Sequence, residues 1–209
     1  MQAGELSQRS LLRRAGLLGL ATALGELPDH LAARGLADRA RSQASAVTDD
    51  TLAGLVAFVL PGDDAFSVQQ GESHPAPGGI AAGIVSLLRE GLDSVAREGA
   101  PVAGATGIAL LLNDYALRVD PAAARGPFRA PFARLTHAHK SDVFQVFEAD
   151  PELSGSELRF LARILPGFVA FVAFAETGVY APGQRAVARR AVGWSDEAAA
   201  RGRRFRRGR

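Results

Sequence analysis

Apolar residues recur at helical spacing in about five segments of this 209-residue chain, and prolines and glycines separate the segments. In the first segment, positions i, i+3, i+4 and i+7 of one helix face are Leu52, Leu55, Val56 and Val59. We expect the other helices at about 80–97, 102–119, 136–149 and 158–175. No run of alternating β-branched residues is long enough for a sheet, so the sequence predicts an all-α fold with a single helical domain.

Capping residues set the expected boundaries of these helices. Thr48, Asp49 or Asp50 can cap the first helix, because each side chain accepts hydrogen bonds from first-turn amides. Thr136 can cap the fourth helix in the same way. Residues 154–157, Ser-Gly-Ser-Glu, have the spacing of a capping box before the fifth helix.

The fifth helix contains the most hydrophobic stretch of the chain, the uncharged run Ile164–Ala175. This run is too short to cross a bilayer, which takes roughly 20 apolar residues, so we expect a core helix surrounded by the others. Pro166 and Gly167 should kink or split the helix, because proline removes one helical hydrogen bond. Its phenylalanines make it the expected packing centre: Phe160, Phe168, Phe171 and Phe174.

Two long connections rich in proline and glycine separate the helices. Residues 61–79 contain three prolines and four glycines, which leave little room for a regular element. A connection of that length is typical of a functional loop. In the second connection, residues 120–135, Phe128 and Phe132 stand among prolines. Aromatic side chains in such a loop are more often held against the body than displayed.

The N-terminal segment has the layout of an export signal. Arg13 and Arg14 directly precede an uncharged, mostly apolar run, which Glu26 and Pro28 end at signal-peptide length. A twin arginine points to the Tat pathway, which carries folded proteins across a membrane. The alternative is an amphipathic N-terminal helix whose arginines face water. The run is too short for a transmembrane helix.

An Ala-Ser-Ala triplet ending at Ala46 offers a cleavage site that would give a mature chain from Val47. We therefore divide the chain into three parts. Residues 1–46 are the expected Tat-type signal peptide, residues 47–195 the helical domain, and residues 196–209 an Arg-rich, disordered tail.

The formal net charge of +2 hides a segregated distribution. Residues 47–200 carry twelve basic against eighteen acidic residues, whereas the last nine residues carry six arginines. Such a tail can bind phosphate or acidic surfaces through its charge, but the acidic body argues against nucleic-acid binding. The absence of cysteine excludes disulfides and thiolate metal sites.

One loop gathers residue types that can carry chemistry. Asp63, Asp64, Glu72 and His74 all lie in the connection 61–79. They could form a cation site or an acid–base cluster. Turn and cap hydrogen bonding explains them more simply, because Asp63 and Asp64 follow a Pro-Gly helix stop.

The remaining candidate motifs are incomplete. His137 and His139 are two residues apart and lack a third ligand nearby, so a metal site is not expected there. Residues 78–83 lead into a helix but lack the G-x-G-x-x-G spacing of a phosphate-binding turn. We therefore expect this chain to have no catalytic, cofactor-binding or metal-binding residues.

The order of several stretches resembles the gluconate 2-dehydrogenase subunit 3 family. No single stretch is diagnostic, and the resemblance covers about residues 48–195 together with the signal. The matching stretches are Phe58–Asp64, Pro75–Gly79, Pro131–Leu135, Leu161–Tyr180 and the ending Gly178–Trp194. The Arg-rich tail after Trp194 and the polar stretch 29–43 depart from the family pattern.

The resemblance implies a small, all-helical, cofactor-free companion of a FAD-containing dehydrogenase of the glucose-methanol-choline (GMC) type. The large subunit of such a complex oxidises a sugar or alcohol and passes electrons on, often to a cytochrome c. The small subunit would bind and stabilise the flavoprotein and escort it through the Tat translocase to the periplasm or another extracytoplasmic site, associated with the membrane through partners. FAD would belong to the partner.

Two hypotheses therefore stand beside each other. The first is this non-catalytic accessory subunit, for which the candidate partner contacts are Asp63, Asp64, Phe66, His74, Phe128 and Phe132. The second is a stand-alone exported enzyme or ligand-binding helical domain that uses Asp63, Asp64 and His74. The second hypothesis needs a pocket in which these three side chains converge.

Overall fold

The computed structural model of the chain describes residues 8–36, 45–96 and 102–174, with side chains from Gly19 onward. Within these ranges every regular element is helical, which confirms the all-α prediction. The α-helices are α1 (Gln8–Ala33), α3 (Ser45–Val59), α4 (Ala65–Gln70), α5 (Gly78–Ala81), α6 (Ile84–Val95), α7 (Gly104–Val119), α8 (Pro131–Arg134), α9 (His137–Ala149) and α10 (Leu158–Phe174). Two 3-10 helices are η1 (Pro121–Ala124) and η2 (Pro151–Leu153).

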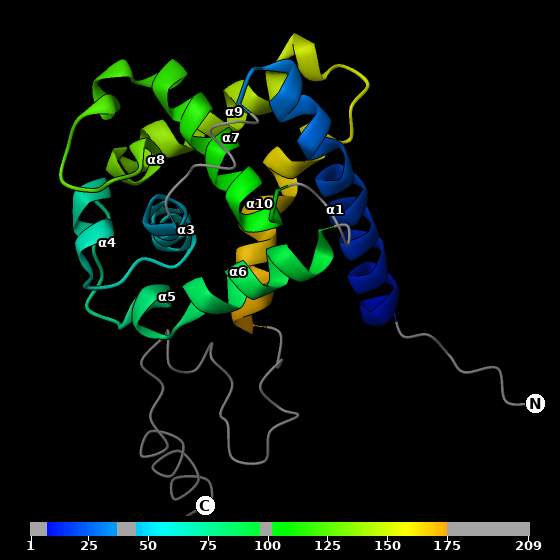
Figure 1. Cartoon of the computed structure of the whole chain (residues 1–209). Helices are drawn as coiled ribbons and strands as arrows, with labels where there is room; N and C mark the ends of the chain where they lie inside the picture. Colours follow the sequence, from blue (N-terminus) through cyan, green and yellow to red (C-terminus); the bar gives the residue numbers. More distant parts are fainter. Residues whose placement is uncertain (1–7, 37–44, 97–101, 175–209) are drawn as a thin grey trace, which may run out of the picture.

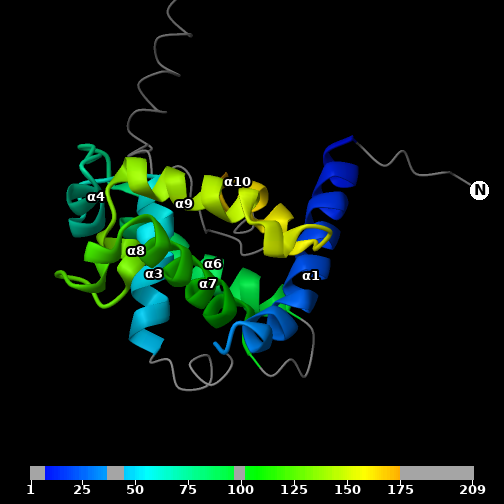
Figure 2. The same cartoon turned by 90° about the horizontal axis from the view of Figure 1, so that it is seen from above.

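The centre of the fold is α7, which packs against α1, α3, α6, α8 and α9. Its fully buried side chains include Ile108, Leu111, Leu112 and Tyr115. A helix that is apolar on nearly every side can be stable only when other helices surround it. Figures 1 and 2 show α7 between α1 at one side of the molecule and the α4 and α8 region at the other.

Helices lie at all the places where hydrophobic periodicity predicts them, as α3, α6, α7, α9 and α10. The helix expected at 80–97 begins only at Ile84, because Gly83 is left-handed at φ +81° and separates α6 from α5, which contains Ile80. Thr136 caps α9 as expected, because its hydroxyl accepts a hydrogen bond from the amide of His139 at 3.2 Å. The expected caps of the first helix are wrong. α3 begins at Ser45 and therefore contains Thr48, Asp49 and Asp50 within its own turns.

α10 differs from its prediction in two respects. It is not split at Pro166 and continues as one helix, because one missing amide costs a single hydrogen bond while Leu165 and Val169 are fully buried. Its phenylalanines are not the packing centre, since Phe160 is 39% and Phe174 is 53% exposed. That position belongs to α7.

The start of α10 is capped from another helix rather than by the predicted capping box. Ser156 Oγ accepts a hydrogen bond from the amide of Leu158 at 3.1 Å and donates to Glu26 Oε2 at 2.5 Å. The amide of Glu157 also donates to Glu26 Oε2, at 3.1 Å. The acidic group of this cap thus comes from α1, which no local sequence pattern can indicate.

The second half of α1 belongs to the hydrophobic core. Leu20, Leu24, Leu27 and Leu31 are at most 3% exposed, and α1 packs on α10, α7 and α6. The cleavage predicted after Ala46 falls in the first turn of α3. Removal of residues 1–46 is an event of processing and stays a prediction.

Several predicted features lie outside the described residues. These are the side chains of Arg13 and Arg14, the end of the family resemblance beyond Phe174, and the Arg-rich tail. Among the helices that the structure describes, none is both long and apolar enough to cross a membrane.

Candidate functional site

The two long connections of the chain come together in one surface. The ring of Phe66, in α4, stacks on the ring of Phe128 with the centroids 4.1 Å apart. Gln69 Nε2 donates to the carbonyl oxygen of Arg134, in α8, at 3.0 Å. We call this surface the α4–α8 face and define it by Phe66, Val68, Gln69, Phe128 and Arg134.

Asp64 builds α4. Its Oδ1 accepts hydrogen bonds from the amides of Phe66 and Ser67 at 2.9 and 3.0 Å, and its Oδ2 accepts from the Ser67 hydroxyl at 2.8 Å. Gly71 ends the helix at φ +84°, a left-handed conformation that glycine adopts without steric cost. Both oxygens of this candidate residue are therefore engaged in a helix N-cap.

A contact between two glycines closes the connection 61–79. A Cβ atom on Gly78, at φ +69°, would lie 2.6 Å from the Cα atom of Gly62, so only glycine fits there. The amide of His74 donates to the carbonyl oxygen of Gly62 at 2.9 Å, and the amide of Gly79 donates to that of Leu60 at 2.9 Å. The connection is therefore a folded unit that holds α4 in place.

The second connection is fixed by the guanidinium of Arg134. Its Nε donates to the carbonyl oxygen of Phe128 at 2.6 Å, and its Nη1 donates to that of Ala123 at 2.7 Å. The amide of Arg129 donates to Asp50 Oδ2, at 2.6 Å, which ties the same loop to α3. The backbone that carries the ring of Phe128 is thus held in position by Arg134 and Asp50.

The underside of α4 rests on Lys140, the chain's single lysine. Lys140 is fully buried, and its Nζ donates to the carbonyl oxygen of Gly54 at 3.0 Å and to Gln70 Oε1 at 2.8 Å. Burial lowers the pKa of its ammonium from 10.5 to about 7, although the negative charge of Asp64 opposes that shift. Gln70 Nε2 in turn donates to the carbonyl oxygen of Ala57 at 2.8 Å.

The role of Lys140 was missed from the sequence, although a signal for it exists. Lys140 occupies position i of a helix face whose positions i+3, i+4 and i+7 are the apolar Val143, Phe144 and Phe147. A charged residue in register with an apolar stripe points to a buried polar contact. The acceptors on Gly54 and Gln70 become apparent only in the folded chain.

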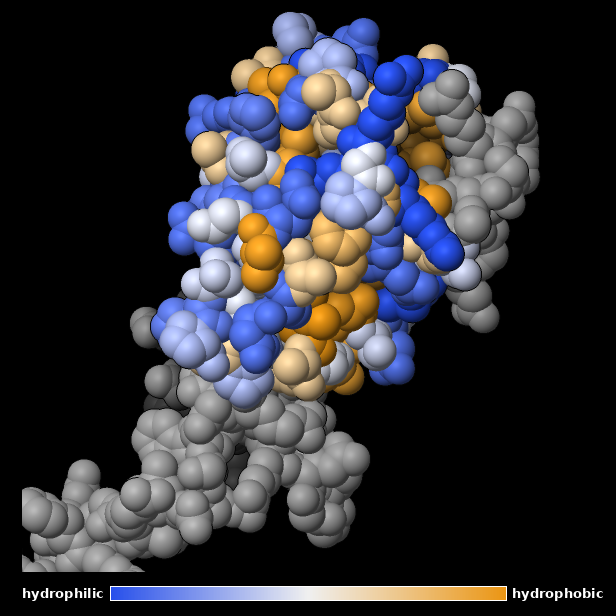
Figure 3. Space-filling model, turned by 90° about the vertical axis from the view of Figure 1, so that its left-hand side faces the viewer, coloured by the Kyte–Doolittle hydropathy of each residue, from blue (hydrophilic) through white to orange (hydrophobic). Residues whose placement is uncertain are grey.

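The exposed part of the α4–α8 face is apolar at its centre. Val68 is 62% exposed, while Phe66 and Phe128 are half-buried against each other. Figure 3 views the molecule from the side on which α4 and α8 lie and shows apolar atoms along the middle of that face, between polar side chains. A rigid, partly apolar surface of this kind suits contact with another protein.

The structure places the other candidate contact residues differently. Asp63 and His74 are exposed, and His74 Nδ1 accepts a hydrogen bond from the amide of Ala76 at 3.1 Å. Phe132 is fully buried, with its ring edge-on to Phe144 at 6.1 Å, so it is a core residue and offers no surface. In the described part of the chain, no three His, Asp or Glu side chains lie close enough to hold a metal ion.

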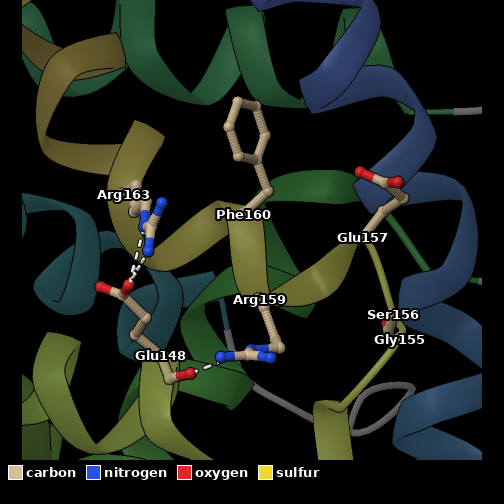
Figure 4. Close-up of a pocket in the computed structure, with 7 residues that line it drawn as sticks. All are labelled: Glu148, Gly155, Ser156, Glu157, Arg159, Phe160 and Arg163. Atoms are coloured by element: carbon tan, nitrogen blue, oxygen red, sulfur yellow. Dashed lines mark hydrogen bonds and ion pairs between the residues drawn. The ribbon is translucent and has the colours of Figure 1, made fainter.

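A polar pocket of about 400 Å³ lies elsewhere, between the end of α9 and the start of α10 (Figure 4). Arg159 Nε donates to the carbonyl oxygen of Glu148 at 3.0 Å, and Arg163 Nε donates to the Glu148 carboxylate at 2.7 Å. The carboxylates of Glu148 and Glu157 balance the formal charges of the two guanidiniums in this lining, which does not favour an anionic ligand. The pocket does not contain any of the predicted site residues.

Comparisons with family models, curated proteins and solved structures found no match for this chain. The likeness to gluconate 2-dehydrogenase subunit 3 proteins therefore rests on the sequence stretches quoted above.

Proposed function

We propose that this chain is a non-catalytic accessory subunit that binds and stabilises a larger FAD-dependent sugar or alcohol dehydrogenase of the GMC type. The observation that carries the proposal is the convergence of stretches that bear the family resemblance. Phe58–Asp64 and Pro75–Gly79 meet where Gly62 contacts Gly78. Pro131–Leu135 is bonded through Arg134 to Gln69 of α4, the helix that lies between those two stretches in the sequence. Three separated stretches thus lie around one face.

The physical state of the α4–α8 face supports a role in partner binding. The aromatic pair Phe66 and Phe128 is fixed by the Asp64 cap and by Arg134, so little conformational entropy is lost when a partner contacts it. Val68, two residues after Phe66 in α4, is 62% exposed and supplies further apolar area on the same short helix. Preorganised aromatic and apolar side chains are the usual centre of a protein–protein contact.

Under this proposal the export signal serves two proteins. Arg13 and Arg14 would engage the Tat translocase, and a flavoprotein without its own signal would cross the membrane bound to this chain. The complex would then work in the periplasm or another extracytoplasmic compartment, with a cytochrome c as a further partner. Replacing both arginines by lysine should leave this chain and its flavoprotein together in the cytoplasm.

The experiment that tests the proposal is purification of the tagged chain from its native cells. We expect a flavin-containing protein to co-purify, identified by its flavin absorbance and by mass spectrometry. The substitution Val68→Asp should abolish this co-purification, because a charge replaces exposed apolar area. Val146→Asp, at a valine of α9 that is 40% exposed, is the matched control and should retain the flavoprotein. A chain that always elutes without flavin contradicts the proposal.

The alternative, a stand-alone enzyme or ligand-binding protein that uses Asp63, Asp64 and His74, has weaker support. The carboxylate of Asp64 is engaged in the α4 cap, and the ring of His74 accepts from a backbone amide of its own loop. Alanine at Asp63 and His74 leaves the cap intact. The alternative gains support only if that double variant removes a measurable binding or catalytic activity.

A further inference from the structure

One face of α1 fills a groove on the rest of the molecule. Its inward side chains are spaced i, i+3, i+4, i+7 and i+11 and are at most 3% exposed: Leu20, Ala23, Leu24, Leu27 and Leu31. The groove is made by α10, α7 and α6. Burial of this many leucines is typical of a core helix rather than of a segment lying loosely on a surface.

The groove and the helix are complementary in shape. A Cβ atom on Gly107 of α7 would lie 2.4 Å from Leu27 Cδ2, so Leu27 inserts where α7 has no side chain. The reverse holds at Gly19 of α1, where a Cβ atom would lie 2.7 Å from Phe160 Cε1. In each of these two contacts a large side chain of one helix packs against a glycine of the other helix. Together they define the register and the direction of α1 on the groove.

Polar contacts also hold α1 in place, at the start of α10. Glu26 completes the N-terminal cap of α10, because its Oε2 accepts from the Ser156 hydroxyl and from the amide of Glu157. Removal of α1 would leave that amide, at the start of a long helix, without its carboxylate partner. The body of the protein is therefore incomplete at α10 when α1 is absent.

The C-terminal end of the groove is acidic and is built around an arginine. The Arg34 guanidinium, whose side chain is 9% exposed, bonds Asp114 at 3.1 Å, Asp150 at 2.6 Å and Glu152 at 2.8 Å. It also donates to the hydroxyl of Tyr115 at 3.2 Å. Without Arg34, these three carboxylates would face one another with the partly exposed Arg118 as the remaining cation in the described network.

We infer that residues 19–36 are a permanent part of the folded protein and not of a removable leader. The molecule contains a helix-binding groove, formed by α6, α7 and α10, with an acidic end at Asp114, Asp150 and Glu152 that binds Arg34. Its occupant is α1 of the same chain, which stays bound when the chain is cut between α1 and α3. This assignment moves the start of the helical body from Val47 to Gly19.

The twin arginine lies on the same helix as the side chains that fill the groove. Arg14 and Leu20 lie on one continuous helix, about 9 Å apart along its axis at a rise of 1.5 Å per residue. The arginine pair is thus joined directly to a helix that docks only on the assembled body. The inference itself does not depend on the proposed function, because it concerns the purified chain alone.

A cut in the folded chain tests the inference. A site for a specific protease replaces residues 38–43 of the full-length chain, and the purified protein is cleaved after folding. Size-exclusion chromatography with mass spectrometry then follows the N-terminal fragment. We expect the fragment to elute with the body in native buffer and to separate from it in urea, which serves as the control for complete cleavage. A fragment that leaves the body in native buffer overturns the inference.

Two matched variants of the cleaved protein test the acidic end of the groove. Arg34→Gln should release the fragment at least about tenfold faster, which corresponds to about 1.4 kcal/mol. Arg89→Gln is the control, because Arg89 pairs with the exposed Asp49 on α3, and its release rate should stay within about twofold of the parent. Equal release rates for the Arg34→Gln variant and its parent would overturn the role assigned to Arg34. Because cleavage follows folding, a slow or incomplete refolding of a variant does not affect the result.

Discussion

Arg34, the residue directly after α1, donates a hydrogen bond to Asp150 Oδ2 at 2.6 Å, across 116 positions of the sequence. The bond joins the end of α1 to the junction between α9 and η2, where the chain turns toward α10. Asp150 also accepts from the Tyr115 hydroxyl at 2.6 Å, so three separate parts of the chain meet at one carboxylate. We expect stability, its pH dependence and the position of α1 to depend on this contact.

Arg34→Ala should destabilise the intact protein by about 3 kcal/mol, because it leaves the buried carboxylate of Asp150 without its main cation. The loss should appear as a lower midpoint in urea unfolding, followed by circular dichroism. Arg89→Ala removes an exposed ion pair and should cost less than about 1 kcal/mol. Equal costs for the two variants would show that Arg34 contributes no more than a surface charge.

The free energy of unfolding should also decrease as the pH is lowered, because Asp150 becomes protonated. Burial alone would raise the pKa of its carboxyl, but hydrogen bonds from Tyr115 and Arg34 outweigh burial and lower the pKa from 3.8 to about 2. A pKa lowered by folding contributes stability that is present above pH 4 and is lost as the pH falls toward 2. A pKa shift of one unit corresponds to about 1.4 kcal/mol, so Asp150 contributes about 2 kcal/mol to stability.

The measurement is urea unfolding of the parent and of Asp150→Asn at pH 6, 4 and 3. Other carboxyl groups titrate in both proteins, so the difference in stability between them isolates Asp150. That difference should be largest at pH 6 and should shrink by pH 3. A difference that stays constant over this range contradicts the assigned cause.

The local parts of the fold could be predicted from the sequence, and the long-range parts could not. Periodicity and Thr136 located α9, because one helix face and one cap are properties of neighbouring residues. The cap of α10 was assigned wrongly, because its acidic group is Glu26, which lies 130 positions from Ser156. An apolar run also could not distinguish a leader from a helix packed on the body in α1, since leucines suit both.

In the candidate site, too, local features could be predicted from the sequence and long-range packing could not. The sequence pointed to the connection 61–79 and to Phe128 by their loop composition, and the structure brings Phe66 and Phe128 into ring contact. Phe132 was named as a contact residue because it stands among prolines, but it begins a short helix and points into the core. Side-chain direction in a short helix depends on tertiary packing, which proline spacing does not determine.

Substitutions at Gly78 test whether its contact with Gly62 stabilises the connection 61–79. Gly78→Ala should destabilise the protein by about 1–3 kcal/mol, because a Cβ at φ +69° is strained and meets the backbone of Gly62. Gly71→Ala is the matched control, since Gly71 has φ +84° but open space around it. Its cost should be smaller, about 1 kcal/mol from strain alone. A larger loss for Gly71→Ala in urea unfolding argues against the glycine contact.

Lys140 should titrate near neutral pH. As the chain's single lysine, it gives one resonance when lysine Cε is labelled with carbon-13, and that resonance should titrate at about 7 in the folded protein. In urea the same resonance should titrate near 10.5, the value for an unburied lysine. A folded-state transition close to 10 would show that the ammonium stays charged in the core.

The same shift has a consequence for stability, whose sign follows from proton binding. Between pH 7 and about 10 the unfolded chain holds a proton on Lys140 that the folded chain has released, so stability rises with pH. Below pH 7 both states are charged, and the full cost of burying the ammonium remains. The neutral amine suits the site, because its two N–H groups match the two uncharged acceptors on Gly54 and Gln70.

Lys140→Met removes the titrating group while keeping an unbranched apolar chain of similar length. The stability of the parent relative to this variant should therefore rise from pH 7 to pH 9.5, measured by urea unfolding at fixed ionic strength. The range ends below pH 10, because near 10.5 the lysine of the unfolded chain also loses its proton and the difference levels off. A parent-minus-variant difference that is flat over this range contradicts a neutral Lys140 beneath α4.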